Sequence, residues 1–153
     1  MTKRMNVAVI LGLVLMSSSL GCCNNKWDIN IKSADLGGRH VDVEVVALAG
    51  DNWEMGKKWV EKPGEYWSDA HPTDKLYVKK FDFTQNGQLV QISKTDEIWD
   101  KGDWALPSRH LLIVRDRNDK ILDIPLSCSN YGKINPIEIE ISGANDVKQM
   151  SGK

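Results

Sequence analysis

The chain has 153 residues, with 20 lysines and arginines against 21 aspartates and glutamates, and its formal net charge is −1 at pH 7. This balance excludes the strongly basic surface with which proteins bind nucleic acid, so no nucleic-acid partner is expected. The length is that of one domain with a core of its own.

The first 23 residues have the layout of a secretory signal peptide. Lys3 and Arg4 precede an unbroken apolar run from Val7 to Met16, and small residues follow. An apolar run of about ten residues matches a signal peptide, whereas a membrane-spanning helix needs roughly 18 or more. We therefore expect residues 1–21 to be removed. The remaining 132 residues (153 minus 21) then carry a net charge of −3, because Lys3 and Arg4 are lost.

The end of this segment, Ser19-Leu20-Gly21-Cys22, resembles the lipobox of bacterial lipoproteins. In that family the cysteine thiol receives a diacylglycerol, the signal is cut just before the cysteine, and the new N-terminus is acylated, with palmitate as the expected chain. The resemblance predicts lipid attachment at Cys22. The alternative acceptor, Cys23, would place Leu20 at the family's usual leucine position but Cys22 before the cut.

Such an anchor places the protein in the bacterial cell envelope. Lipoproteins with aspartate after the lipidated cysteine are commonly retained at the inner membrane. Here Cys23 stands at that position, which favours the outer membrane, facing the periplasm. This compartment permits a disulfide between Cys23 and Cys128, but a free Cys128 packed as a small hydrophobic residue is favoured over that pair.

The mature chain is expected to consist of a lipidated tether (residues 22–26), a β-sandwich domain (residues 27–143) and a polar C-terminal tail (residues 144–153). Alternating apolar residues separated by turn residues predict short strands. Seven or eight such strands with one helical insertion indicate an all-β sandwich of transthyretin or immunoglobulin type. The predicted strands are Trp27–Lys32, His40–Leu48, Lys75–Phe83, Leu89–Ser93, His110–Arg115, Ile121–Ser127 and Ile134–Ser142.

The helical insertion is predicted at Asp51–Glu61, ending before Pro63. The chain contains six tryptophans. Tryptophan side chains can fill a core, anchor a protein partner or stack on sugars. At least half of the six are expected to be structural. Those expected to be partly exposed, and thus to contact a partner or a glycan, are Trp53, Trp67 and Trp104.

No catalytic or metal-binding motif is recognised. His40, His71 and His110 lie far apart, and none has a second ligand at metal-binding spacing along the chain. The loop Asp116–Asp119 is too short for a calcium loop and is expected to be a plain turn. We therefore expect a protein that is not an enzyme and that has no cofactor and no metal.

After the lipobox come a short tether, a Gly37-Gly38 turn into a valine-rich strand, a tryptophan-containing helical insertion and strands ending in an isoleucine-rich one. This order is similar to that of the outer-membrane lipoprotein of type VI secretion systems. The resemblance implies a transthyretin-like sandwich that is not an enzyme and that docks the periplasmic part of an inner-membrane partner through its loops. Two functions stay open: a structural or adaptor component that binds another envelope protein, and a small glycan- or peptidoglycan-binding module that uses exposed tryptophans.

Overall fold

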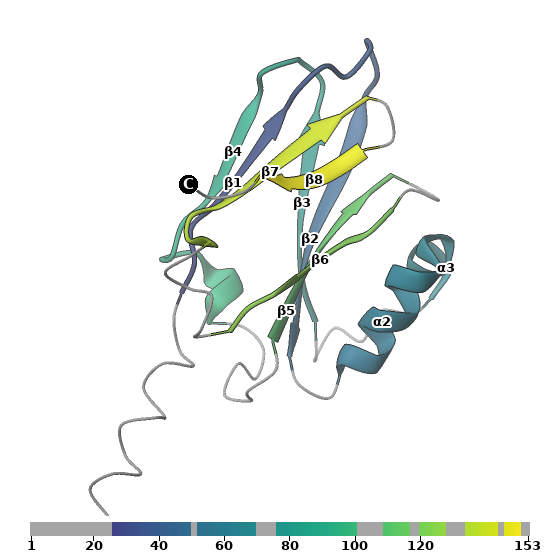
Figure 1. Cartoon of the computed structure of the whole chain (residues 1–153), viewed down its shortest axis with the longest axis vertical. Helices are drawn as coiled ribbons and strands as arrows, with labels where there is room; N and C mark the ends of the chain where they lie inside the picture. The colour runs from purple at the N-terminus through teal and green to yellow at the C-terminus, as the bar shows by residue number, and fades with distance from the viewer. Residues whose placement is uncertain are drawn as a thin grey trace, which may run out of the picture.

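Eight strands form two four-stranded sheets in the computed structural model (Figure 1). The structure describes residues 26–49, 52–69, 76–100, 109–116, 120–127, 134–143 and 146–150. The predicted signal peptide, the predicted lipid-attachment residue Cys22 and the other two cysteines, Cys23 and Cys128, lie outside these residues. Among the described residues, no helix is long and apolar enough to span a bilayer.

The first sheet has the strand order β4-β1-β7-β8. Its strand β1 is parallel to β7 and antiparallel to β4, and β7 is antiparallel to β8. The strands are β1 (Ile29–Ser33), β4 (Leu89–Ile92), β7 (Ile137–Ser142) and β8 (Asp146–Met150).

The second sheet has the strand order β3-β2-β5-β6, and all its neighbouring strands are antiparallel. Its long central strand β2 has β3 on one side and β5 on the other, and β6 forms the far edge. The strands are β2 (Val41–Ala49), β3 (Leu76–Phe83), β5 (Arg109–Arg115) and β6 (Leu122–Pro125).

The core lies between the two sheets because alternate residues of each strand point inward. The isoleucines of β1 and β7 and the odd-numbered valines of β2 are all buried there. Each such side chain contributes about 1.5–3 kcal/mol when it is fully buried. The side chains concerned include Ile29, Ile31, Val41, Val43, Val45, Ile137, Ile139 and Ile141.

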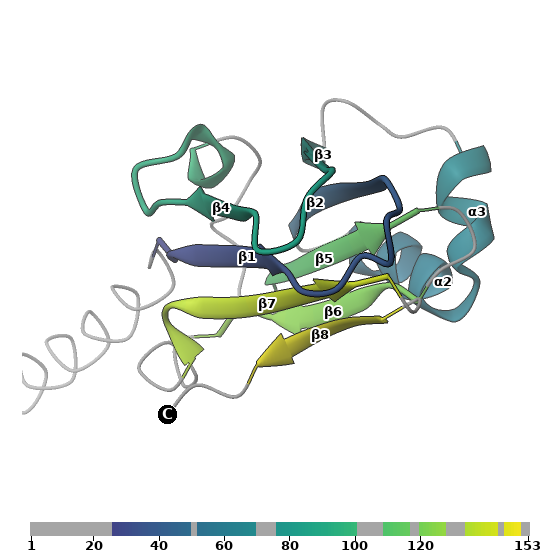
Figure 2. The same cartoon turned by 90° about the horizontal axis from the view of Figure 1, so that it is seen from above.

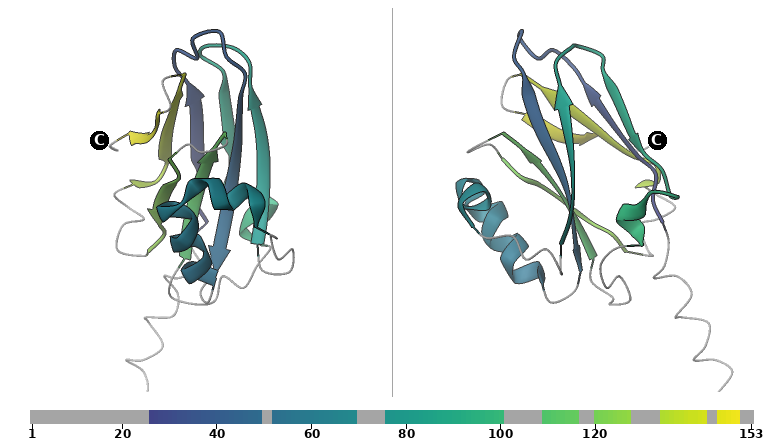
Figure 3. Two further views of the ribbon diagram at one scale, coloured as in Figure 1. Left: turned by 90° about the vertical axis from the view of Figure 1, so that its right-hand side faces the viewer. Right: turned by 180° about the vertical axis from the view of Figure 1, so that it is seen from behind.

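Two helices, α2 (Trp53–Glu61) and α3 (Pro63–Ser68), cover part of the outer face of the second sheet (Figures 2 and 3). Their buried residues Trp59 and Tyr66 pack with outward-facing residues of β2 and β5 in a second apolar cluster. These two strands are therefore apolar on both faces where the helices lie. The strand residues of this second cluster are Val46, Leu48, Leu112 and Val114.

All seven predicted strands are present, with ends shifted by at most three residues, and β5 is an interior strand. The β-sandwich prediction is confirmed. The helical insertion is longer than predicted, because Pro63 ends α2 and then occupies the first turn of α3, where its missing N–H costs nothing.

The prediction of a polar tail after Gly143 is wrong for residues 146–150. This segment forms the edge strand β8, antiparallel to β7, with Val147 opposite Ile141. An edge strand needs few apolar residues: Val147 is buried, and Lys148 reaches Glu140 on β7 at 2.9 Å. The polar composition therefore gave no sign of the strand.

Candidate partner-docking surface

The sandwich has two ends that differ in what they carry. The chain enters β1 from Lys26, so this end, which also holds the paired residues Ile29, Ile92 and Ile137, is called the proximal end. The opposite end is called the distal end. It carries the β1–β2 loop (residues 34–40) and the β3–β4 turn (residues 84–88) (Figure 1). Gly143 lies there too, because it follows β7, which is parallel to β1. The nine-residue strand β2 connects the two ends, which places them about 30 Å apart.

The β1–β2 loop is shaped by two glycines. Gly37 and Gly38 have φ values of 61° and 73°, a region that L-residues with side chains rarely adopt. Asp35 accepts a hydrogen bond from the Gly37 N–H at 2.9 Å through its side chain. Leu36 is buried, and its carbonyl accepts the Arg39 N–H at 3.1 Å. The loop is thus pinned by one apolar side chain while its polar residues stay exposed.

Hydrogen bonds join this loop to the other segments of the distal end. The Asn86 side chain accepts the Leu36 N–H at 2.8 Å, and the Ser33 hydroxyl donates to the Gln85 carbonyl at 2.6 Å. The Gly143 N–H donates to the Asp35 carbonyl at 2.6 Å. Three segments that are far apart in the sequence therefore form one connected surface.

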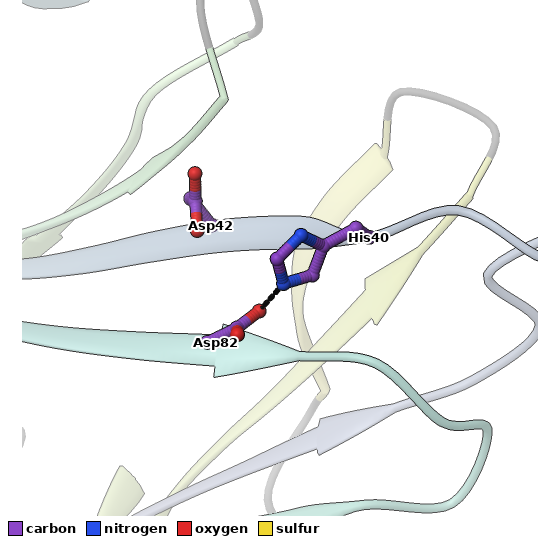
Figure 4. Close-up of side chains that lie close together, drawn as sticks. All are labelled: His40, Asp42 and Asp82. Atoms are coloured by element: carbon purple, nitrogen blue, oxygen red, sulfur yellow. Dashed lines mark ion pairs between the residues drawn. The ribbon is translucent and has the colours of Figure 1, made fainter.

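Charged side chains gather beside these loops. His40 and Asp42 lie on the outer face at the start of β2, and Asp82 is the register partner of Asp42 on β3. The His40 ring forms an ion pair with Asp82 (Figure 4). All three side chains are exposed, and one ligand atom from each lies within 4.8 Å of the others.

Two of the predicted contact residues, Trp53 and Trp67, are half-buried in the second apolar cluster. The Trp53 ring is stacked on His110, with ring centroids 3.6 Å apart and planes 6° from parallel. The Trp67 indole N–H donates to the Asp116 carbonyl at 2.8 Å. Both rings therefore have structural contacts, and the third predicted contact residue, Trp104, lies outside the described residues.

The other described tryptophans, Trp27, Trp59 and Trp99, are buried. A sugar platform needs aromatic rings side by side on an exposed face, and the five tryptophans that the structure describes form no such pair. The glycan alternative therefore gains no support from this part of the chain.

Under the helices, the buried carboxylate of Glu44 is paired on both of its oxygens. The Tyr66 hydroxyl donates to Glu44, whose other oxygen lies 2.7 Å from the Lys80 ammonium. Burial, together with this hydrogen bond, raises the pKa of Tyr66 well above its ordinary value of 10. The hydroxyl therefore keeps its proton at any ordinary pH. This contact fastens α3 to the sheet.

One open pocket of about 320 Å³ lies on the outer face of the first sheet, near the proximal end. Its polar side chains already bond one another, since Asn30 donates to Glu138 at 2.8 Å and accepts from Gln91 at 3.1 Å. The described lining holds no aromatic ring and no histidine: it consists of Asp28, Asn30, Gln91, Ile92, Ser93 and Pro136.

The surface at the distal end was not foreseen as such from the sequence. Gly37-Gly38 gave one signal, because paired glycines mark a turn. Spacing along the chain indicates no metal ligands, whereas strand register brings Asp82 opposite Asp42 from 40 residues away. No sequence spacing could have shown that proximity.

The comparisons with known proteins find similarity in fold among solved structures. No protein-family model and no curated protein matches the chain. Among solved structures, the chain is similar to Serratia marcescens Lip, which is described as a membrane bound component of the type VI secretion system. The TM-score is 0.46 and the sequence identity 9%, and the match covers 84% of this chain and 99% of the Serratia chain.

Proposed function

We propose that this protein is a lipid-anchored, non-enzymatic envelope lipoprotein whose distal end binds the periplasmic part of another envelope protein in a secretion assembly. The observation that carries the proposal is the arrangement of the two ends. The interlocked loops lie about 30 Å from the proximal end, and the proximal end begins only four residues after the predicted lipid-attachment residue Cys22. A short tether holds the proximal end near the bilayer and leaves the distal end facing the periplasm.

The distal end also has the properties of a binding surface. Its loops are fixed by hydrogen bonds before any partner arrives, so little ordering entropy is lost on association. Its exposed charges, which include Asp35, Arg39 and Asp42, can set orientation and specificity. By contrast, part of the outer face of the second sheet is already covered by α2 and α3.

The family resemblance of the sequence supports the same role. The lipobox, the Gly37-Gly38 turn and the helical insertion follow the order found in the outer-membrane lipoprotein of type VI secretion systems. The Serratia protein with a similar fold is described as a membrane-bound component of that system. We therefore propose that this chain, too, is attached to the outer membrane and binds a protein partner.

Site-specific photo-crosslinking in the native cell tests the docking surface. A photoreactive residue placed at exposed Arg39 or Gln85 on the distal end should give a defined crosslinked protein band. The matched controls are the exposed positions Lys57 on α2 and Lys94 near the proximal end, which should give none. Crosslinks from the controls with none from the distal positions would place the partner elsewhere and refute the proposed surface.

The anchor is tested separately by the substitution Cys22→Ser. We expect this variant to move from the membrane fraction to the soluble fraction, because several acyl chains, each methylene worth ~0.8 kcal/mol, are then lost. The same substitution at Cys23 is the control and should leave the protein on the membrane. A Cys22→Ser variant that still sediments with membranes contradicts the predicted attachment site.

A further inference from the structure

We propose that His40, Asp42 and Asp82 form a site for a divalent transition-metal ion, with Zn²⁺ as the ion that fits best. The site lies on the outer face of β2 and β3, beside the loops of the distal end (Figure 4). It is independent of the docking proposal, because its ligands come from this chain alone.

The backbone explains why these three side chains meet. His40 immediately precedes β2 and stands two residues before Asp42, the spacing at which side chains of extended backbone point to the same face. Asp82 lies directly opposite Asp42 in the antiparallel pair, where Cβ atoms are about 4.5–5.5 Å apart. Three ligand side chains thus converge from two adjacent strands.

The two carboxylates are placed where like charges repel each other. Identical charges directly opposite one another on paired strands are destabilising. His40 offsets the charge of Asp82 only when its ring is protonated. A divalent cation bound by the two carboxylates and the neutral ring would offset this repulsion and add a bond to each ligand.

The donor set selects the kind of metal. Zn²⁺ binds imidazole nitrogen at about 2.0–2.1 Å and carboxylate oxygen at about 2.0–2.2 Å, in tetrahedral geometry. The ligand atoms already lie within 4.8 Å of one another, and exposed side chains need only small rotations to close on one ion. Calcium and magnesium prefer sites made of oxygen alone, so the imidazole favours zinc. Three protein ligands leave the fourth position to water.

The strands that carry the ligands are held in place. The Asp42 backbone N–H donates to the Asp116 side chain, and the Asp42 carbonyl accepts the Asp116 N–H, both at 3.0 Å. On its other side, β2 is paired with β3 along the whole of β3, up to Val41 opposite Phe83. The ligand carriers are therefore positioned by the sheet, and only the side-chain rotamers have to adjust.

Calorimetric titration of the untagged, full-length lipoprotein in detergent with zinc chloride tests the site. We expect one saturable site with a dissociation constant below 100 μM. His40→Gln and Asp82→Asn should each weaken binding at least tenfold. The matched control, Asp35→Asn, removes an exposed carboxylate of the same end that is outside the cluster and should leave the affinity unchanged.

Histidine-ring NMR during the same titration locates the ion. Signals of the His40 ring should shift with zinc, whereas those of the half-buried His110, which is bonded to Asp123 at 2.8 Å, should not. Zinc binding only in the millimolar range, or binding that His40→Gln leaves unchanged, overturns the proposal. Tighter binding of calcium than of zinc overturns the assignment of the metal as well.

Discussion

The substitution Gly143→Ala should destabilise the sandwich through the distal end. A Cβ at this position would lie 2.3 Å from the Leu36 carbonyl oxygen and 2.4 Å from its carbon, both backbone atoms. Reaching an ordinary contact of 3.4 Å requires a displacement of about 1 Å. The Gly143 N–H bond to the Asp35 carbonyl, now 2.6 Å long, would then be lost. Overpacking costs about 1–3 kcal/mol and the hydrogen bond about 1 kcal/mol, which gives roughly 2–4 kcal/mol.

Gly37→Ala is the matched control. Its Cβ would meet nothing within 4 Å, so only the φ of 61° opposes the substitution, at a cost of about 1–2 kcal/mol. Urea unfolding of both variants, followed by tryptophan fluorescence, gives the two free energies of unfolding. Gly143→Ala should have the lower midpoint. An equal or smaller loss for Gly143→Ala would mean that the loop yields freely, and would refute the account of a rigid distal end.

Two further predictions concern polar contacts. Partial burial acts to raise the pKa of Asp96, but hydrogen bonds from the Lys79 ammonium and the Ile98 N–H outweigh it and lower that pKa below its ordinary value of 3.8. Its contribution to stability is therefore present above about pH 4 and is lost as pH falls through the lowered value. In urea unfolding, Asp96→Asn should be about 1–2 kcal/mol less stable than the unchanged protein at pH 7, and this difference should shrink as the pH is lowered below 4. Tyr66→Phe should cost about 1–3 kcal/mol in the same assay because buried Glu44 loses a donor, whereas Tyr77→Phe, whose hydroxyl bonds an exposed carboxylate, should cost less than about 0.5 kcal/mol.

The fold could be predicted from the sequence because its strands alternate cleanly. Ile137, Ile139 and Ile141 point inward, with Glu138 and Glu140 between them, as their burial confirms. The strand β8 could not be predicted in the same way, because it has a single buried residue, Val147, and so shows no alternation of apolar and polar residues. Sheet order and register also lie beyond sequence patterns, because β1 pairs with β7 from more than 100 residues away.

The tryptophans show why the candidate site was harder to predict than the fold. Composition alone made Trp53 and Trp67 candidates for contact with a partner. The structure leaves both partly exposed, as predicted, and packs them against the second apolar cluster, where the helices cover β2 and β5. An aromatic residue in a helical insertion can face either the sheet or the solvent. The sequence does not show which, because it does not show which side of the helix packs against the sheet.

The two-sided burial of β2 and β5 explains which surfaces remain for function. The inner face of the second sheet is closed by the core and much of its outer face by α2 and α3. On the outer face of β2, this cover begins at Glu44, which Tyr66 contacts, and leaves His40 and Asp42 exposed. The helical insertion therefore covers the outer face of β2 from Glu44 toward the proximal end, and the exposed side chains of His40 and Asp42 lie at the distal end of the strand, beyond this cover. The helices thus act as structural cover for the outer face of β2 and β5, and the docking surface proposed at the distal end lies beyond this cover.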